Sequence, residues 1–317
     1  MSMAKILKLE DTNVCLVTRS ELLDKGYTRG KIANLLRKGE LVRICNGVYL
    51  DPPVEVNYRE STHLLGCAGF MLSARRDWAL SHWSAALMHG LPGWKLPLAT
   101  TAVTMDSPTP RSMKGPTSYQ RMTRLPADDV TIIAGFKVTG IERTLLDVGT
   151  TCGFAAAVVA IESALYKQLV RKHVLVEYFG SKRNLNNLPA GLKALAFASA
   201  LSESVLESRS RLFFDHFGIA QPEQQVLIHT RSGRKYRVDF LWRALKLIGE
   251  ADGKAKIVGA GTTREQEKRL REHWRREEDL RAEGYTVVRW TWDDLANPHE
   301  LRTRLESAFA QARRVAA

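Results

Sequence analysis

Acidic residues stand inside segments that otherwise favour buried β-strands in the last third of the chain. They constrain the fold more than any other feature of the sequence. Asp239 lies within the apolar run VDFLW, and Glu250 and Asp252 end the next run, LKLIGEADG. Residues two apart in a strand point to the same face of a sheet, so Glu250 and Asp252 should project together. Because burying a carboxylate is costly unless a cation or hydrogen-bond donors satisfy it, these positions predict a functional site.

The segments around these acids follow the order helix, three strands, helix, strand, helix. An amphipathic helix over SESVLESRSRLFFDHFG is followed by the strand-like runs EQQVLIHT, KYRVDFLW and LKLIGEADG. A long charged helix over residues 264–283, the strand YTVVRWTW and a helix from about Asp293 complete the order. We expect one sheet with helices on its faces. If the second and third strands pair as a hairpin, Asp239 approaches Glu250, and Glu207 of the first helix can approach as a further carboxylate.

A divalent metal would satisfy such a group of carboxylates. Mg²⁺ takes hard oxygen ligands, usually one or two carboxylates with waters and substrate phosphate, and bound metal lowers the pKa of a water. We therefore predict a Mg²⁺ or Mn²⁺ site with metal ligands (Asp239, Glu250 and Asp252), a supporting helix acid (Glu207) and cations that position water or offset phosphate charge (Lys254 or Lys256). The alternative is a solvated strand end, in which the lysines are surface ion-pair partners of Glu250 and Asp252.

The helix acid Glu207 and the runs VDF, GEADGKAK and REEDLRAEGYTVVRWTWDDL together resemble the very-short-patch-repair-like branch of the PD-(D/E)XK nuclease superfamily, over residues 202–295. The resemblance implies a restriction-endonuclease-like α/β core with Asp239 and Glu250 as metal ligands and Arg276 as a phosphate contact. Asp252 stands where the superfamily motif usually has Lys, a variation associated with this branch. Many relatives carry a His after the Gly, where this chain has lysines, so the general base stays open.

The first 54 residues predict a winged helix-turn-helix. Thr18 and Glu21 form a capping box before a short helix that ends at Gly26, and Thr28 caps a second helix, TRGKIANLLRKG. The runs ELVRI and GVYL then flank Asn46-Gly47, a strong hairpin signal. The second helix of such a motif lies in the major groove, while the wing holds phosphates. We predict DNA contacts from its polar side chains and those of the hairpin: Arg29, Lys31, Asn34, Arg37, Lys38 and Arg43. The alternative is a domain that uses the same fold against protein.

The stretch VTRSELLDKGYTRGKIANLLRKGELVRICNGVYL resembles the winged-helix domain of the AbiEi family of antitoxins, and ALSHWSAALMHGLP and GFKVTGIERTLLDVG resemble the region that follows it in related proteins. The resemblance implies DNA binding at the protein's own promoter. Residues 55–200 then form a mixed α/β middle domain, and a loop over FGSKRNLNNLPAG separates them from a third domain, residues 201–317. His82 and His89 are expected to be packing or surface residues, because no third metal-ligand type lies nearby.

Charge supports a polyanion partner. The chain has 47 Lys and Arg against 34 Asp and Glu, a net charge of +13, and neutralising phosphates releases condensed counterions. No apolar run reaches the roughly 18 residues of a membrane span, and MSMAKILKLEDTN lacks the apolar core of a secretory signal. Four scattered cysteines indicate reduced thiols. We expect a cytoplasmic protein that binds DNA and no membrane.

Two functions of different classes follow for this multidomain α/β chain. The first is a metal-dependent DNA endonuclease that the winged helix targets, in phage defence or mobile-element biology. The second is a non-enzymatic transcriptional regulator or antitoxin whose nuclease-type fold only clamps DNA. The retained acids favour the enzyme, because carboxylates on a phosphate-binding surface repel the ligand. An RNA-directed role, a homodimer and a toxin- or antitoxin-type protein partner stay open.

Overall fold

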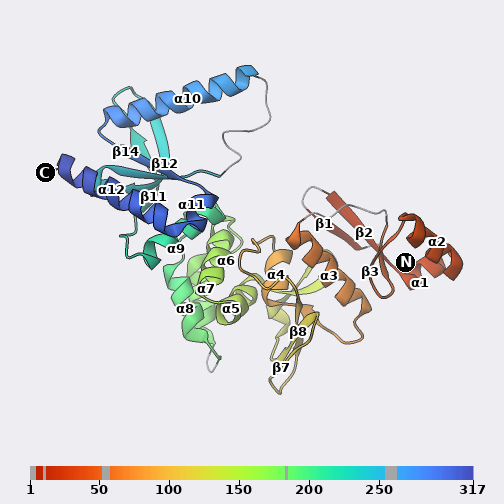
Figure 1. Ribbon diagram of the computed structural model, residues 1–317. Coiled ribbons are helices and arrows are strands. Elements are labelled where there is room, and N and C mark those ends of the chain that lie inside the picture. The colour runs from red at the N-terminus through yellow and green to blue at the C-terminus, as the bar shows by residue number, and fades with distance from the viewer. Residues whose placement is uncertain (1–4, 10–11, 52–57, 183–184, 254–262, 317) are drawn as a thin grey trace. The chain divides into compact units, whose positions relative to one another are not determined.

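The computed structural model describes residues 5–9, 12–51, 58–182, 185–253 and 263–316 (Figure 1). The chain divides into two compact units, residues 1–198 and 199–317. The described residues build a mixed α/β architecture with a four-stranded and a six-stranded sheet in unit 1 and a four-stranded sheet in unit 2. No helix within the described ranges is long and apolar enough to cross a membrane.

The N-terminal part of unit 1 combines two helices with a sheet of antiparallel pairs in the order β1-β2-β4-β3. Its elements are β1 (Lys5–Leu9), β2 (Thr12–Thr18), α1 (Arg19–Asp24), α2 (Arg29–Lys38), β3 (Val42–Cys45) and β4 (Val48–Leu50). The capping box predicted at Thr18 is present, and the Thr18 amide donates to Glu21 Oε2 over 2.7 Å. Gly47 has a φ of 79° between β3 and β4, a left-handed conformation that glycine adopts readily.

The rest of unit 1 contains a six-stranded sheet in the order β7-β8-β6-β5-β10-β9. Its strands are β5 (Ala79–Leu80), β6 (Thr101–Asp106), β7 (Arg111–Lys114), β8 (Ser118–Thr123), β9 (Val130–Ile133) and β10 (Phe136–Thr139). Its helices are α3 (Arg59–Ser73), α4 (His82–Met88), the 3₁₀ turn η1 (Ala127–Asp129), α5 (Ile141–Thr151), α6 (Phe154–Tyr166), α7 (Lys172–Ser181) and α8 (Leu188–Phe197).

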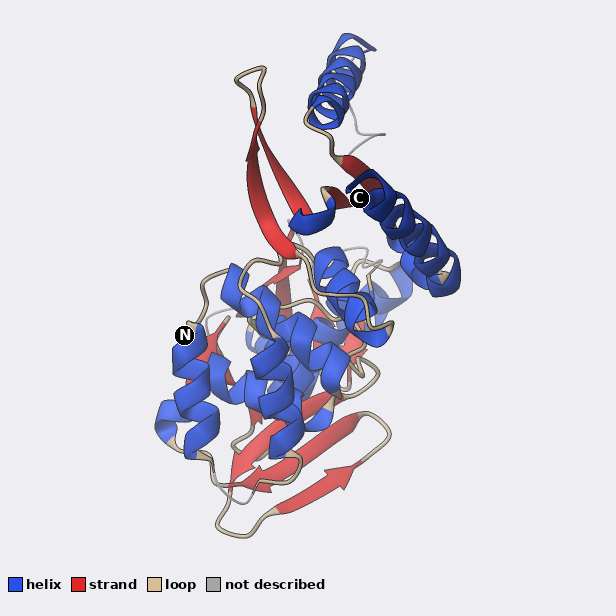
Figure 2. Ribbon diagram, turned by 90° about the vertical axis from the view of Figure 1, so that its left-hand side faces the viewer, coloured by secondary structure: helices blue, strands red, loops and turns tan. Residues whose placement is uncertain are grey.

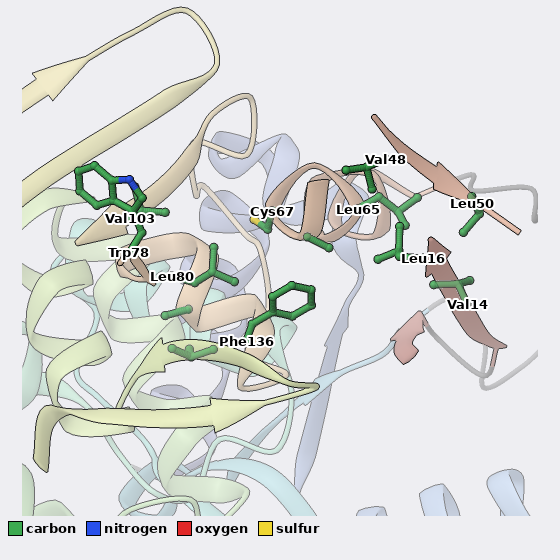
Figure 3. Packing of buried hydrophobic residues seen from close by; sticks show 13 residues of the cluster. Val14, Leu16, Val48, Leu50, Leu65, Cys67, Trp78, Leu80, Val103 and Phe136 are labelled. Atoms are coloured by element: carbon green, nitrogen blue, oxygen red, sulfur yellow. The ribbon is translucent and has the colours of Figure 1, made fainter. Parts of the chain in front are cut away.

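One hydrophobic cluster joins these two parts of unit 1. Leu16 of β2 and Leu50 of β4 pack in the same cluster as Leu65 of α3 and Phe136 of β10 (Figure 3). Gly69 of α3 makes this approach close, because a Cβ there would lie 3.1 Å from the Cys45 sulfur. The described residues of the predicted N-terminal domain and those of the predicted middle domain therefore share a core.

The loop predicted over FGSKRNLNNLPAG is wrong at both ends. Helix α7 runs to Ser181 and α8 begins at Leu188. Pro189 falls in the first turn of α8, where the missing N–H of a proline has no helical partner to lose. The proline that suggested a loop therefore starts a helix.

Unit 2 has the predicted order of helix, three strands, helix, strand and helices. Its elements are α9 (Val205–His216), β11 (Glu223–His229), β12 (Lys235–Trp242), the 3₁₀ turn η2 (Arg243–Leu245), β13 (Leu247–Ala251), α10 (Thr263–Ala282), β14 (Thr286–Trp290), α11 (Trp292–Ala296) and α12 (Pro298–Ala316). Strands β11, β12 and β13 are antiparallel neighbours, and Figure 2 shows the long hairpin of the first two. β14 pairs with β13 in parallel, so the chain crosses over through α10.

Apolar side chains cover both faces of this sheet. Phe214 of α9 packs on Phe240 and Trp290 in one cluster, and Leu280 of α10 packs with Ile248 in the other. The polar residues of β12 and β13 are consequently fixed between well-packed neighbours.

Candidate active site

Charged residues of three strands lie in one row across the sheet of unit 2. The antiparallel register of β12 and β13, continued by one residue past its last pair, places Asp239 opposite Glu250. In the parallel pair, Glu250 is opposite Arg289 of β14. Residues opposite each other share a face of the sheet. On β11 the register skips Gln225, which has a φ of 53° and lies at the position across from Asp239.

Glu250 is the most buried acid of this row, with 4% of its surface exposed. Its Oε1 accepts from Arg276 Nη2 of α10 over 2.5 Å. Burial is the largest effect and raises the pKa of Glu250 to about 7, while Arg276 lowers it and the charge of Asp239 raises it further. A carboxyl with this pKa holds a proton at neutral pH more readily than an ordinary glutamate, unless another cation joins it.

Asp239 stands between two other acids. Its Oδ2 accepts the backbone N–H of Ala251 over 2.9 Å, which fixes the carboxylate toward β13. Its charge adds to the raised pKa of both Glu250 and Glu207, after burial in each case. The structure thus brings together Glu207, Asp239 and Glu250, as the sequence predicts.

Glu207 lies in the first turn of α9 and is buried. Its Oε2 accepts from the backbone N–H of Glu203 over 3.0 Å and from Gln225 Nε2 over 2.8 Å. Its Oε1 accepts from the hydroxyl of Ser204, the N-cap of the helix, over 2.9 Å. These donors hold the carboxylate rigidly beside Asp239, although burial still raises its pKa.

Two arginines flank the acids. Arg289 Nη1 lies 3.1 Å from Asp252 Oδ2, and Arg276 Nη2 also donates to the carbonyl of Arg237 over 2.9 Å. Arg276 Nε and Arg289 Nη2 are buried and find no acceptor among the described residues. Buried donors without an acceptor are rare in folded proteins, so both guanidinium groups keep capacity for an anionic group.

Gln225 and Arg289 belong to this site but are not predicted from the sequence. The sequence contains one indication of Arg289, because this residue interrupts the apolar strand TVVRW in the same way that Asp239 interrupts VDFLW. Nothing in the sequence indicates Gln225, because neither its left-handed backbone conformation nor its hydrogen bond to Glu207 follows from a sequence pattern.

Asp239 and Glu250 are the two carboxylates of this site that could bind a metal ion. Within the described ranges, no group of three or more His, Cys, Asp and Glu side chains is placed to hold a metal, so the set with Asp252 as third ligand stays a prediction. Two carboxylates fit Mg²⁺, which completes its shell with water and substrate oxygens. Lys254 and Lys256 lie outside the described residues.

The predicted DNA contacts of unit 1 lie on α2 and β3. Ile32 is the buried residue of α2, and Asn34 is half-buried. The other five predicted contacts are exposed: Arg29, Lys31, Arg37, Lys38 and Arg43. The Lys31 ammonium lies 4.0 Å from the centre of the Tyr27 ring, and that of Lys38 lies 3.8 Å from Glu40. Cations placed in this way remain accessible to phosphates.

Unit 1 contains a second group of buried charges. The guanidinium group of Arg143 lies 3.0 Å from Asp147 and 3.6 Å from Asp129. Tyr178 donates to Asp129 over 2.7 Å, and Lys182 lies 3.8 Å from the same carboxylate. These partners bind one another across α5, α7 and η1.

His82 belongs to this group, and His89 lies at the end of its helix. His82 is fully buried with a φ of 50°, its Nδ1 lies 2.8 Å from the Ser81 hydroxyl and 3.9 Å from Asp147, and burial lowers its pKa to about 4. His89 Nε2 lies 2.8 Å from the carbonyl of Thr139. Both histidines are packing residues, as expected.

No family model matches the chain. Two curated proteins of Mycobacterium tuberculosis, the uncharacterized protein MT2308 of strain CDC 1551 and the uncharacterized protein Rv2248 of strain H37Rv, are each 24% identical to it over 294 residues. Each alignment covers 90% of this chain and 98% of the relative, so it extends across both units. The crystal structure of the RV2827C protein from Mycobacterium tuberculosis aligns with a TM-score of 0.37 and 16% identity, over 62% of this chain and 75% of that one.

Proposed function

We propose that unit 2 is a metal-dependent DNA endonuclease core of the PD-(D/E)XK kind and that residues 1–54 form a winged helix that brings it to DNA. The observation that carries the proposal is the convergence of Glu207, Asp239 and Glu250, in which burial and the charge of Asp239 raise the pKa of the other two carboxyls. A bound cation favours the ionised form of such buried carboxyls.

Asp239 and Glu250 would hold the metal through their carboxylate oxygens. Ala251 engages Asp239 Oδ2 and Arg276 engages Glu250 Oε1. A bound divalent metal lowers the pKa of a water and offsets charge on a phosphate. The hydrogen bonds to Ala251 and Arg276 orient the two carboxylates in advance, which is the arrangement that a rigid site needs.

Arg276 and Arg289 are suited to bind the phosphate that is attacked. Each is tied to an acid of the cluster and keeps one buried N–H without an acceptor among the described residues. Guanidinium groups match phosphate geometry with two parallel donors. Glu207 acts through Gln225 and Asp239, so we assign it a positioning role.

A second candidate function is a non-enzymatic DNA-binding regulator. The observation that favours it is that Glu250 and Asp252 already pair with Arg276 and Arg289, as they would in a fold that binds no metal. In this case the exposed cations of α2, such as Arg29 and Arg37, would carry all of the function.

Cleavage of supercoiled plasmid at low salt separates the two functions. We expect nicking or linearisation with Mg²⁺ or Mn²⁺, none with EDTA, and a loss on the order of 100-fold or more in Asp239→Asn and Glu250→Gln. Asp215→Asn is the matched control, because Asp215 is an exposed acid on α9. Activity that persists in both site variants would contradict the proposal. DNA binding without cleavage, indifferent to metal and weakened by Arg37→Ala, would establish the regulator.

A further inference from the structure

A cavity of about 710 Å³ lies in unit 1 between strand β3, helix α3 and the segment around residues 98–101. Its apolar wall includes Ile44 of β3, Phe70 of α3 and Leu98. Ligand sites of small molecules are usually apolar cavities of roughly 300–1,000 Å³ with a few polar groups. The volume therefore fits a small organic molecule.

Among the described polar residues that line the cavity, Arg59 is the one that is charged at pH 7. Burial lowers the pKa of His63, whose ring nitrogens lie 2.8 Å from the Leu98 carbonyl and 2.9 Å from the Ser84 hydroxyl. Burial raises the pKa of the Cys45 thiol. Both side chains are thus neutral at pH 7, and no acid stands among the described lining residues. Arg59 is left as the cation.

Arg59 is placed to bind an anion. It is exposed at the first position of α3, and its side chain has no partner among the described residues. The N-cap residue of this 15-residue helix, Tyr58, gives the first N–H groups no side-chain acceptor. A helix N-terminus favours negative charge, and the guanidinium group of Arg59 adds to that preference at the same end of the cavity.

We propose that this cavity binds a small organic anion whose carboxylate or phosphate lies at Arg59 and whose apolar body lies against Phe70, Leu98 and Ile44. Its described lining residues all belong to unit 1. Ile44 follows Arg43 on β3, so an occupant would also contact the predicted wing. Control of DNA binding by that contact rests on the proposed function, whereas ligand binding itself does not.

Gly66 allows the cavity to be filled without disturbing the fold. It lines the cavity from the middle of α3, and a Cβ there would meet only the Thr101 hydroxyl oxygen, at 4.0 Å. Replacing a helical glycine also removes the entropic disadvantage of glycine, so Gly66→Leu should fold at least as well as the original chain. Gly180→Leu is the matched control, because Gly180 is an exposed position of α7 with nothing within 4 Å of its Cβ.

The test uses the full chain without DNA and two probe anions, octanoate and 2-naphthoate, with octanol and octylamine as uncharged and cationic counterparts. Binding is measured by calorimetry and by the shift in melting temperature. We expect at least one anion to bind at millimolar concentration or better, at least tenfold more tightly than octanol, and octylamine not to bind. Arg59→Gln should reduce anion affinity to that of the alcohol, and Gly66→Leu should abolish binding that Gly180→Leu retains.

Three outcomes would overturn the proposal. The first is that neither anion binds at concentrations up to 10 mM, which is about ten times the weakest dissociation constant expected here. The second is equal affinity for octanoate and octanol. The third is binding that survives Gly66→Leu. None of these outcomes depends on plasmid cleavage, so failure of this proposal and failure of the nuclease proposal are distinguishable.

Discussion

In unit 1 the buried guanidinium group of Arg143 lies between Asp129 and Asp147, and Lys182 adds a second cation at the rim. Among the described residues of unit 2, Arg276 pairs with Glu250 and Arg289 pairs with Asp252, in a cluster of four carboxylates. The carboxylates are Glu207, Asp239, Glu250 and Asp252. Both groups are built from buried charge, but in unit 1 a buried cation lies between two acids, whereas in unit 2 the charge of one acid raises the pKa of two others.

This difference favours a structural role for the charges of unit 1 and the proposed functional role for those of unit 2. A buried ion pair whose partners are all present holds elements together, and removing one partner leaves an uncompensated charge. A cluster in which buried acids raise one another's pKa is instead relieved when one carboxyl is neutralised or a cation binds. Burial alone therefore does not indicate a site, whereas burial together with repulsion between acids favours one.

The largest expected effect is a loss of stability in unit 1 when Arg143 is replaced, compared with no loss in unit 2 when Glu250 is replaced. Arg143→Met should destabilise unit 1 by about 3–5 kcal/mol, because it leaves two buried carboxylates without their main cation. Glu250→Gln should leave the stability of unit 2 in EDTA unchanged or higher. Native-state hydrogen exchange of amides in α5 and β13 reads the two units separately. Equal losses in the two variants would end the distinction between the clusters.

The pH dependence of stability should have opposite signs in the two units. The pKa of His82 is lowered from 6.5 to about 4, so its contribution to stability is lost as pH falls from 6.5 toward 4. The pKa of Glu250 is raised from 4.5 to about 7, so its contribution is present below pH 4.5 and lost as pH rises toward 7. Each change amounts to about 3 kcal/mol at 1.36 kcal/mol per pKa unit.

Hydrogen exchange in EDTA between pH 4.5 and 6.5 measures both slopes in one sample. We expect protection of α4 to rise with pH and protection of β13 to fall. His82→Asn should flatten only the first slope, since Asn tolerates the positive φ at this position, and Glu250→Gln only the second. Slopes of the same sign in both units would refute the assignment of their buried charges.

Metal addition should then stabilise one unit only. At a Mg²⁺ concentration 100 times the dissociation constant, a single site adds about 2.7 kcal/mol to the stability of the fold that binds it. This gain should appear in β13 and α9 and be absent from α5. Chelation should reverse it, and Asp239→Asn should prevent it. A gain in unit 1, or one that survives Asp239→Asn, would place the cation elsewhere.

The acids of unit 2 could be predicted because local rules determine where they lie. Strand alternation and the hairpin between β12 and β13 place Asp239 opposite Glu250, and both follow from short stretches of sequence. The capping box at Thr18 and the turn at Gly47 were predictable for the same reason. These features depend on residues close together in the chain.

Features that depend on distant pairing could not be predicted. Arg289 meets Asp252 only because β14 returns in parallel beside β13 after the crossover. The unusual backbone of Gln225 depends on how β11 pairs with β12. The hairpin of β1 and β2 is likewise not predicted from the sequence. The sequence therefore indicated which acids meet but not which cations oppose them.

The smallest expected effect concerns Lys182, which lies at the rim of the buried charges around Arg143 in unit 1. Lys182 is about a third exposed, lies 3.8 Å from Asp129 and stacks 4.0 Å from the centre of the Tyr178 ring. Water screens such a pair, so Lys182→Met should cost unit 1 about 1 kcal/mol or less by hydrogen exchange in α7. A loss as large as that of Arg143→Met would mean that the number of charges matters and their burial does not. A small loss would show that the buried guanidinium group of Arg143 provides most of the charge compensation at Asp129 and Asp147.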